Sequence, residues 1–194
     1  MTPSPRSGMM VSGRAGRPPG RGGAVLELGK AGEHGTGGGV VPVLADGRVV
    51  ATLQTSNWRT QAVAVVGDRS WTFDRRKQEL VGRWTPEPAD AVRVRARQTS
   101  MWKGTWEVDL EGTVVTVESD SYWKGTHRVL AGGRQVAGSG TVGTWSPRPT
   151  LTADPQVPLD HQVFLLWLLV VISRRNTSTM AAATGAIVIA GGSS

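Results

Sequence analysis

The chain has 194 residues, a formal net charge of +7 and no cysteine. The lack of cysteine excludes disulfides, Cys-ligated zinc, iron–sulfur clusters and a thiolate nucleophile, and it permits a reducing cytoplasm, where we expect the protein. The basic character favours acidic partners such as anionic lipid headgroups or nucleic acid.

The first 39 residues are dominated by Gly, Pro and Arg, with one apolar stretch at Ala24–Leu28. This composition cannot bury enough apolar surface to offset the entropy of ordering, so residues 1–39 are predicted to form a mostly disordered basic tail. No apolar segment follows the arginines as it would in a secretory signal. An alternative is that translation starts at Met9, Met10 or Val11.

From Val40 onward, short runs of β-branched residues are separated by turn signals such as Asp46-Gly47 and Glu111-Gly112. Regular spacing of this kind is typical of an all-β barrel or sandwich. Short connections favour antiparallel pairing of neighbouring strands, so residues 40–179 are predicted to form a closed antiparallel β-barrel of about 11–12 short strands. The predicted strands are Val40–Leu44, Arg48–Gln54, Trp58–Val66, Ser70–Phe73, Glu79–Trp84, Ala91–Arg97, Trp102–Leu110, Thr113–Ser119, Trp123–Leu130, Arg134–Ser139 and Thr141–Trp145.

A short motif recurs in this region: "SMWKGT" at Ser100–Thr105, "SYWKGT" at Ser121–Thr126 and a looser copy, "SNWRTQ", at Ser56–Gln61. Side chains alternate between the two faces of a strand, so Trp102 and Trp106 are predicted to fill the barrel interior while Lys103 faces outward. A base-stacking platform needs rings and cations on one face. Nucleic acid is therefore not expected as a partner.

The same alternation predicts a basic outer face on Ala91–Arg97 and its neighbours. A trial register opposes Arg97 to Lys103 and places Val94 beside Trp106, which keeps both faces in phase but brings two cations together. Such a pair repels unless an anion binds there, so the choice lies between solvated charges and a site for an acidic ligand. The candidate anion- or lipid-binding residues are Arg93, Arg95, Arg97, Lys103, Lys124 and Arg128.

A helix is predicted near residues 160–174, with Asp160 capping its first turn and Arg174-Arg175 at its last. Val163–Ile172 is apolar on every side, so it must be enclosed by protein or lipid, with Trp167 among the most buried residues. Ten residues span only about 15 Å, half of a bilayer core, so we expect this helix inside the barrel. Residues 180–194 are predicted to form a small-residue tail or an extra strand. Contact of both apolar C-terminal segments with a membrane is the alternative.

A barrel of short antiparallel strands around one nearly polar-free helix resembles the tubby C-terminal-like superfamily, which includes tubby domains, phospholipid scramblases and LURP-one-related proteins. The resemblance covers Val40–Arg175 and rests on the element order, on the helix "VFLLWLLVVI" and on "SMWKGTWEVDLEG" followed by "SYWKGTHRVLAGG". It implies binding at membrane surfaces through basic residues of the barrel. The calcium-binding acidic loop associated with scramblases is not visible in this sequence.

No catalytic or cofactor-binding arrangement is predicted. The three histidines, His34, His127 and His161, fall in a Gly-rich tail, on an inward strand face and in the helix. Gly35–Gly39 lacks the Lys-Ser/Thr of a phosphate loop. A paired-carboxylate hydrolase would require geometry that sequence does not supply.

We therefore expect a non-enzymatic binding module without cofactor or metal, cytoplasmic and peripheral to the membrane, that binds anionic lipid or another acidic partner. The alternative is a structural or protein-interaction domain without a lipid ligand. Nothing in the sequence predicts the oligomeric state.

Overall fold

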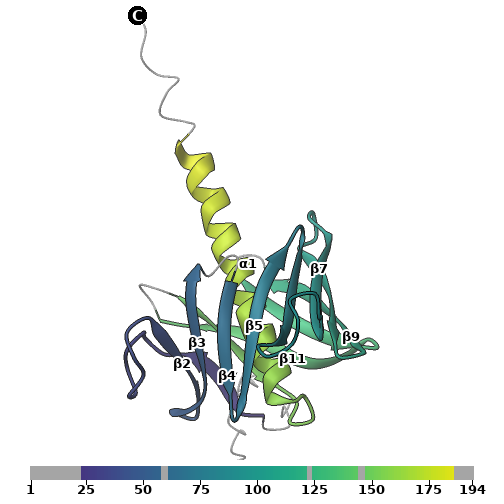
Figure 1. Ribbon diagram of the computed structural model, residues 1–194. Coiled ribbons are helices and arrows are strands. Elements are labelled where there is room, and N and C mark those ends of the chain that lie inside the picture. Colours follow the sequence, from purple (N-terminus) through teal and green to yellow (C-terminus); the bar gives the residue numbers. More distant parts are fainter. Residues whose placement is uncertain (1–22, 58–60, 122–123, 144–146, 186–194) are drawn as a thin grey trace, which may run out of the picture.

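The computed structural model describes residues 23–57, 61–121, 124–143 and 147–185, with the backbone alone at 56, 57 and 176–185. The chain forms a closed barrel of twelve antiparallel strands with one helix, α1, running through it (Figure 1). Each strand pairs with its neighbours along the chain, and β1 pairs with both β2 and β12 to close the barrel. The predicted fold class is confirmed.

The elements follow one another as a simple meander, and their bounds are as follows. They are β1 Val25–Leu28, β2 Val40–Ala45, β3 Arg48–Asn57, β4 Gln61–Val66, β5 Arg69–Arg76, β6 Glu79–Trp84, β7 Val94–Ser100, β8 Thr105–Leu110, β9 Thr113–Ser121, β10 Thr126–Ala131, β11 Arg134–Val142, β12 Arg148–Ala153 and α1 Leu159–Gly185.

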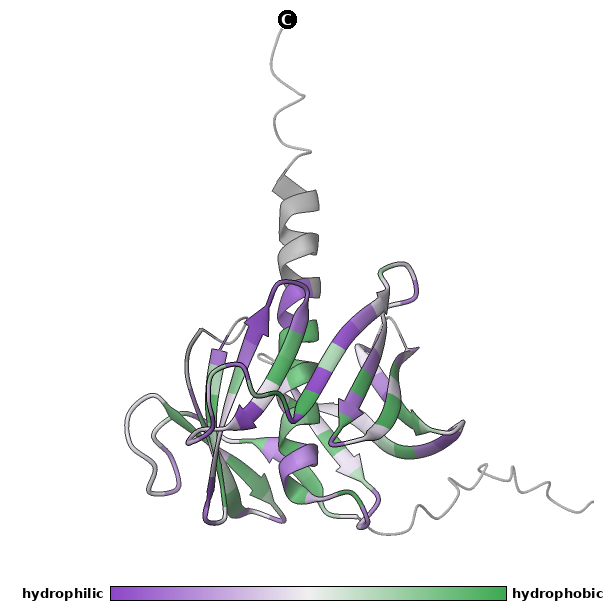
Figure 2. Cartoon of the chain, turned by 45° about the vertical axis from the view of Figure 1, so that its right-hand side comes forward, coloured by the Kyte–Doolittle hydropathy of each residue, from purple (hydrophilic) through white to green (hydrophobic). Residues whose placement is uncertain are grey.

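The barrel core is built around the apolar stretch of α1, which Figure 2 shows passing through the strands. Every residue from Val163 to Ile172 is buried, and Trp167 is fully excluded from solvent, as the sequence predicts. Phe73 of β5 stacks on Trp167 with 5.3 Å between ring centroids, and it meets Phe164 edge-on at the same separation. These aromatic contacts fix the helix against the barrel wall.

The barrel begins earlier in the chain than the predicted boundary at residue 40. Val25–Leu28 forms β1, with Leu26 and Leu28 buried against the core and Leu26 paired with both Ala45 and Leu151. The prediction of a disordered tail up to residue 39 is therefore wrong for this segment. Four residues are too short for a sequence pattern, yet they bridge β2 and β12 and remove both sheet edges.

Two strand predictions near the C-terminus also need correction. Arg134–Ser139 and Thr141–Trp145, predicted as separate strands, belong in their described parts to the single strand β11. Strand β12 was not predicted, because a proline such as Pro149 within a run of residues argues against a strand. Trp145 lies outside the described residues.

The helix is longer than predicted and begins differently. α1 continues past Arg174 to Gly185, so residues 180–185 are helical rather than a tail or an extra strand. The rest of that prediction, residues 186–194, lies outside the described residues. The Asp160 carboxylate does not cap the helix but accepts hydrogen bonds from Arg69 Nη1 at 2.9 Å and Trp71 Nε1 at 3.2 Å. Among the described residues, no helix has both the length and the apolar character needed to cross a membrane.

The two ends of the barrel differ in what they carry. Because the strands alternate in direction, the connections after β3, β5, β7, β9 and β11 all lie at one end. α1 starts at the opposite end, after β12, and leaves the barrel beside those hairpins (Figure 1). We call the end where α1 begins the entry end, and the end where it leaves the exit end.

Candidate functional site

Four of the six predicted site cations lie along the barrel wall, and each is paired with a carboxylate. Arg95, Arg97 and Arg128 lie on strands, with 51%, 58% and 47% of their side chains exposed. The fourth, Arg93, lies just before β7. The nitrogen–oxygen distances are 3.6 Å for Arg95–Glu79, 3.1 Å for Arg97–Glu107, 3.2 Å for Arg128–Glu118, 2.6 Å for Arg93–Glu87 and 2.9 Å for Arg93–Glu111. The wall is therefore a set of neutralised pairs rather than a bare basic surface.

The trial register between β7 and β8 is wrong. Arg97 lies opposite Glu107 rather than Lys103, and Val94 lies opposite Leu110 rather than Trp106. The slip is an even number of residues, so the side chains within β7 and β8 keep their predicted faces. The observed register replaces the repulsive Arg97–Lys103 pair with an attractive one.

Arg93 is the centre of a partly buried cluster near the entry end. Its guanidinium carbon lies 3.5 Å from the centroid of the Trp84 ring. Hydrogen bonding to Glu87 and then Glu111 raises the pKa of Arg93, and the Arg93 hydrogen bond is the main cause of the lowered pKa of Glu87. Burial acts to raise the pKa of Glu111, but hydrogen bonds from Arg93 and His161 outweigh it, so the net shift is downward. The cluster ties the start of α1 to the wall.

The two remaining cations, Lys103 and Lys124, lie in a pair of matching hairpins at the exit end. The Lys103 backbone N–H donates to Ser100 Oγ at 3.1 Å, and the Lys124 N–H donates to Ser121 Oγ at 3.4 Å. The following Gly104 and Gly125 have φ of 62° and 61°, in the left-handed region that favours glycine. The repeated Ser-x-Trp-Lys-Gly-Thr motif thus encodes a hairpin turn.

Because of this turn, Trp102 does not face the barrel interior as predicted. β8 begins at Thr105, so the in-out alternation that buries Trp106 cannot be extended back through Gly104. Trp102 is 99% exposed at the hairpin tip and Met101 beside it is 89% exposed. The predicted inward orientation of Trp102 is wrong. The corresponding Trp58 and Trp123 lie outside the described residues.

The exit end carries further positive charge. Arg75, Arg76 and Lys77 follow one another at the β5–β6 turn, and α1 leaves the barrel with Arg175 close to the Trp106 ring, 5.1 Å from its centroid. Burial, and then repulsion from Arg75, lowers the pKa of Arg175. Neither Lys103 nor Lys124 forms an ion pair with any described residue, which separates them from the arginines of the wall.

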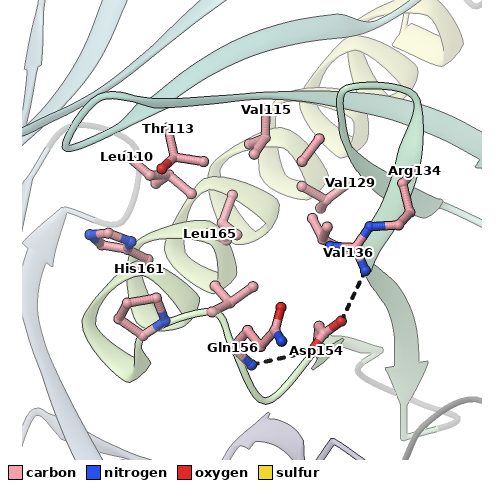
Figure 3. Close-up of a pocket in the computed structure, with 13 residues that line it drawn as sticks. Leu110, Thr113, Val115, Val129, Arg134, Val136, Asp154, Gln156, His161 and Leu165 are labelled. Atoms are coloured by element: carbon pink, nitrogen blue, oxygen red, sulfur yellow. Dashed lines mark hydrogen bonds and ion pairs between the residues drawn. The ribbon is translucent and has the colours of Figure 1, made fainter.

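A cavity of about 350 Å³ opens at the entry end, between α1, strands β8 to β11 and the segment that follows β12 (Figure 3). Its walls are mostly aliphatic, and its mouth carries polar groups. Arg134 and Asp154 form an ion pair there, at 3.4 Å, and His161 Nε2 lies 3.0 Å from Glu111 Oε2. This cavity was not predicted from the sequence, because its walls come from six segments with no shared motif.

The histidines do not form a common site. His34 lies in an exposed turn, His127 is buried on the inward face of β10, and His161 is on the first turn of α1. Burial lowers the pKa of His127, and its Nδ1 has no hydrogen-bond partner in the described part of the chain. Within that part, no group of three or more His, Cys, Asp or Glu side chains is placed to hold a metal ion.

Comparison of the chain with protein-family models, with curated proteins and with solved structures gives no match. The resemblance to the tubby C-terminal-like superfamily therefore stays a prediction drawn from the sequence.

Proposed function

We propose that this protein is a non-enzymatic binding module that attaches to anionic membrane surfaces through the exit end of its barrel. The observation that carries the proposal is the β7–β8 hairpin tip, where Trp102, 99% exposed, lies between the exposed Met101 and Lys103. Trp and the basic residues are the side chains that favour the membrane–water interface. A single exposed apolar residue needs no explanation, but a Met-Trp-Lys tip in a basic neighbourhood does.

The location of the remaining cations also supports the exit end as the membrane contact. Lys124 occupies the matching position of the β9–β10 hairpin, and Arg75 and Lys77 are exposed at the β5–β6 turn. These residues lie on turns at the end of the barrel from which α1 emerges. Figure 1 shows α1 extending beyond these hairpins, so an anionic surface at this end would meet the helix as well as the turns. The Trp ring would lie in the headgroup layer and the cations near the phosphates.

The wall arginines are poorer candidates for the same contact, although the sequence analysis grouped them with the two lysines. Arg95, Arg97 and Arg128 already have carboxylate partners, so an anionic lipid would have to displace Glu79, Glu107 or Glu118. This competition reduces what each arginine can add to binding. The proposal accordingly moves the lipid contact from the outer wall to the exit end.

The second candidate is a structural or protein-interaction domain whose charge only maintains solubility. The paired wall supports it, because compensated surface charge is ordinary on soluble barrels. The two candidates differ in one respect: only the membrane proposal requires particular side chains, Trp102 and Lys103, at the hairpin tip.

Vesicle sedimentation with a charge-matched pair of variants tests the proposal. The exit-end variant carries Lys103→Gln and Lys124→Gln, and the wall variant carries Arg95→Gln and Arg97→Gln, so both lose two cations. Each cation near an anionic surface contributes about 1 kcal/mol, so the exit-end variant should bind phosphatidylserine-containing vesicles roughly 30-fold more weakly. The wall variant should bind nearly as well as the wild type.

Trp102→Ser separates the aromatic contribution from charge. It should weaken vesicle binding at moderate salt, where screening has already reduced the electrostatic part. Equal loss of binding in the exit-end and wall variants would move the contact to the barrel wall. No binding by the wild type at low salt would remove the membrane proposal and leave the second candidate.

A further inference from the structure

We infer that the cavity at the entry end is a binding site for a small, neutral, mainly apolar molecule that carries one hydrogen-bonding group. The site lies at the opposite end of the barrel from the proposed membrane contact, so the two proposals stand or fall separately. Its volume of about 350 Å³ lies within the range of small-molecule sites. An apolar cavity of about 150 Å³ already holds benzene, so a ring with a short chain fits here.

The walls are preformed by the fold. Four buried core residues line the walls: Leu110 of β8, Val115 of β9, Val129 of β10 and Leu165 of α1. Ala131 and Val136 complete the wall with short side chains, which leaves the space unfilled. A ligand would therefore enter an existing apolar site without reorganising the barrel, which keeps the entropic cost of binding low.

Polar groups surround the mouth of the cavity. Figure 3 shows Gln156, Thr113 and His161 around the aliphatic walls, with Asp154 joined to Arg134. The Gln156 side-chain amide and the Thr113 hydroxyl make no hydrogen bond to any described residue. A ligand hydroxyl or amide at the mouth would find both a donor and an acceptor there, while its apolar body lies against Leu165.

Charge at the mouth selects against anions. Arg134 is paired with Asp154, and His161 is bonded to Glu111, which in turn shares Arg93 with Glu87. Of the charged side chains that line the cavity, Arg134 and Asp154 neutralise each other. A ligand carboxylate would compete with Asp154 for Arg134, whereas a neutral group meets no such cost.

Saturation-transfer NMR on the full chain tests the inference with two probes that share one apolar body, phenylbutanol and phenylbutyrate. Phenylbutanol should bind, and phenylbutyrate should bind at least about tenfold more weakly. Val136→Phe and the milder Ala131→Leu should abolish the phenylbutanol signal by filling the cavity. Val65→Phe, which adds the same ring at a 43% exposed position on β4, should leave it unchanged.

A fourth variant checks the role of the mouth. Gln156→Ala should weaken phenylbutanol about threefold to tenfold but leave butylbenzene, which lacks the hydroxyl, unaffected. Absence of phenylbutanol binding to the wild type at about 1 mM overturns the inference, as does binding that persists in both cavity-filling variants. Equal or tighter binding of phenylbutyrate overturns the neutral ligand class.

Discussion

Arg97 and Glu107 face each other across strands β7 and β8, with 3.1 Å between Nη2 and Oε1. Both side chains are more than half exposed, at 58% and 51%. The pair belongs to a series of cross-strand pairs on the barrel wall that includes Arg95–Glu79 and Arg128–Glu118. Solvent screens each of them, so their main effect is to set register and cancel charge.

A double-mutant cycle of Arg97→Gln and Glu107→Gln should measure this effect. Because the pair is exposed, the coupling energy in urea unfolding should lie between about 0 and 1 kcal/mol and should shrink as salt is added. A coupling above about 2 kcal/mol that is insensitive to salt would contradict the view that this pair is screened.

Leu166→Asp should abolish folding of the soluble barrel. Leu166 is fully buried in α1, and a carboxylate there would have no partner and no water. Circular dichroism in the near ultraviolet and the thermal melt report the outcome, because the buried Trp71, Trp106 and Trp167 depend on tight packing.

The matched control for this change is Val65→Asp. Val65 lies on β4 opposite the neutral Thr52 and Ser70 and is 43% exposed, so the same charge should be tolerated there with little loss of stability. A Leu166→Asp variant that keeps a cooperative melt and the near-ultraviolet Trp signal would refute the buried central helix.

Gly82→Ala should destabilise the barrel although it adds only one methyl group. A Cβ at Gly82 would lie 2.5 Å from Val94 Cγ2 and 3.0 Å from Phe73 Cδ1. Overpacking of this kind costs about 1–3 kcal/mol, and here it would push Phe73 against Trp167. Urea unfolding of Gly82→Ala should show the loss, whereas Gly37→Ala, with no atom within 4 Å of its Cβ, should be near neutral. Equal stability of the two variants would show that the β6 wall can relax around Phe73.

The barrel and its central helix could be predicted because their signals are local and strong. Val163–Ile172 has no polar face, which leaves enclosure as the solution, and β-branched alternation marks most strands. The β1 and β12 strands escaped prediction because their evidence is non-local: each gains its stability by closing the sheet. The sequence of β1 is too short, and that of β12 is interrupted by Pro149, so neither can be recognised as a strand before its pairing partners are known.

The candidate site was predicted less well for a related reason. Alternation placed Arg95, Arg97 and Arg128 on the correct outer face, but their carboxylate partners depend on register, which an even slip changes without any visible penalty. The prediction that Trp102 faces inward was wrong because Gly104 lies in a turn, where the alternation of the strand ends. The Gly after Trp-Lys in both copies of the motif was the available signal, since a left-handed residue breaks a strand.

Stability should depend on pH through His127. This side chain is buried on the inward face of β10 and is 8% exposed, and burial lowers its pKa below the ordinary value of 6.5. The unfolded chain therefore takes up a proton at a higher pH than the native protein. Above pH 6.5 both states are neutral and the stability is complete; as the pH falls below 6.5, only the unfolded state is stabilised by the proton, so the free energy of unfolding falls.

Urea unfolding of the wild type between about pH 7.5 and 5 should show this decline, and His127→Gln should remove most of it. Glu87 and Glu111 have pKa values lowered from 4.5, so they stay charged in this window and their contribution is lost only in stronger acid. His34→Gln is the matched control, because His34 is exposed and should leave the pH profile as it is. If His127→Gln and the wild type lose stability in parallel, the pH dependence belongs to another group, and the unpartnered Nδ1 of His127 has no thermodynamic consequence.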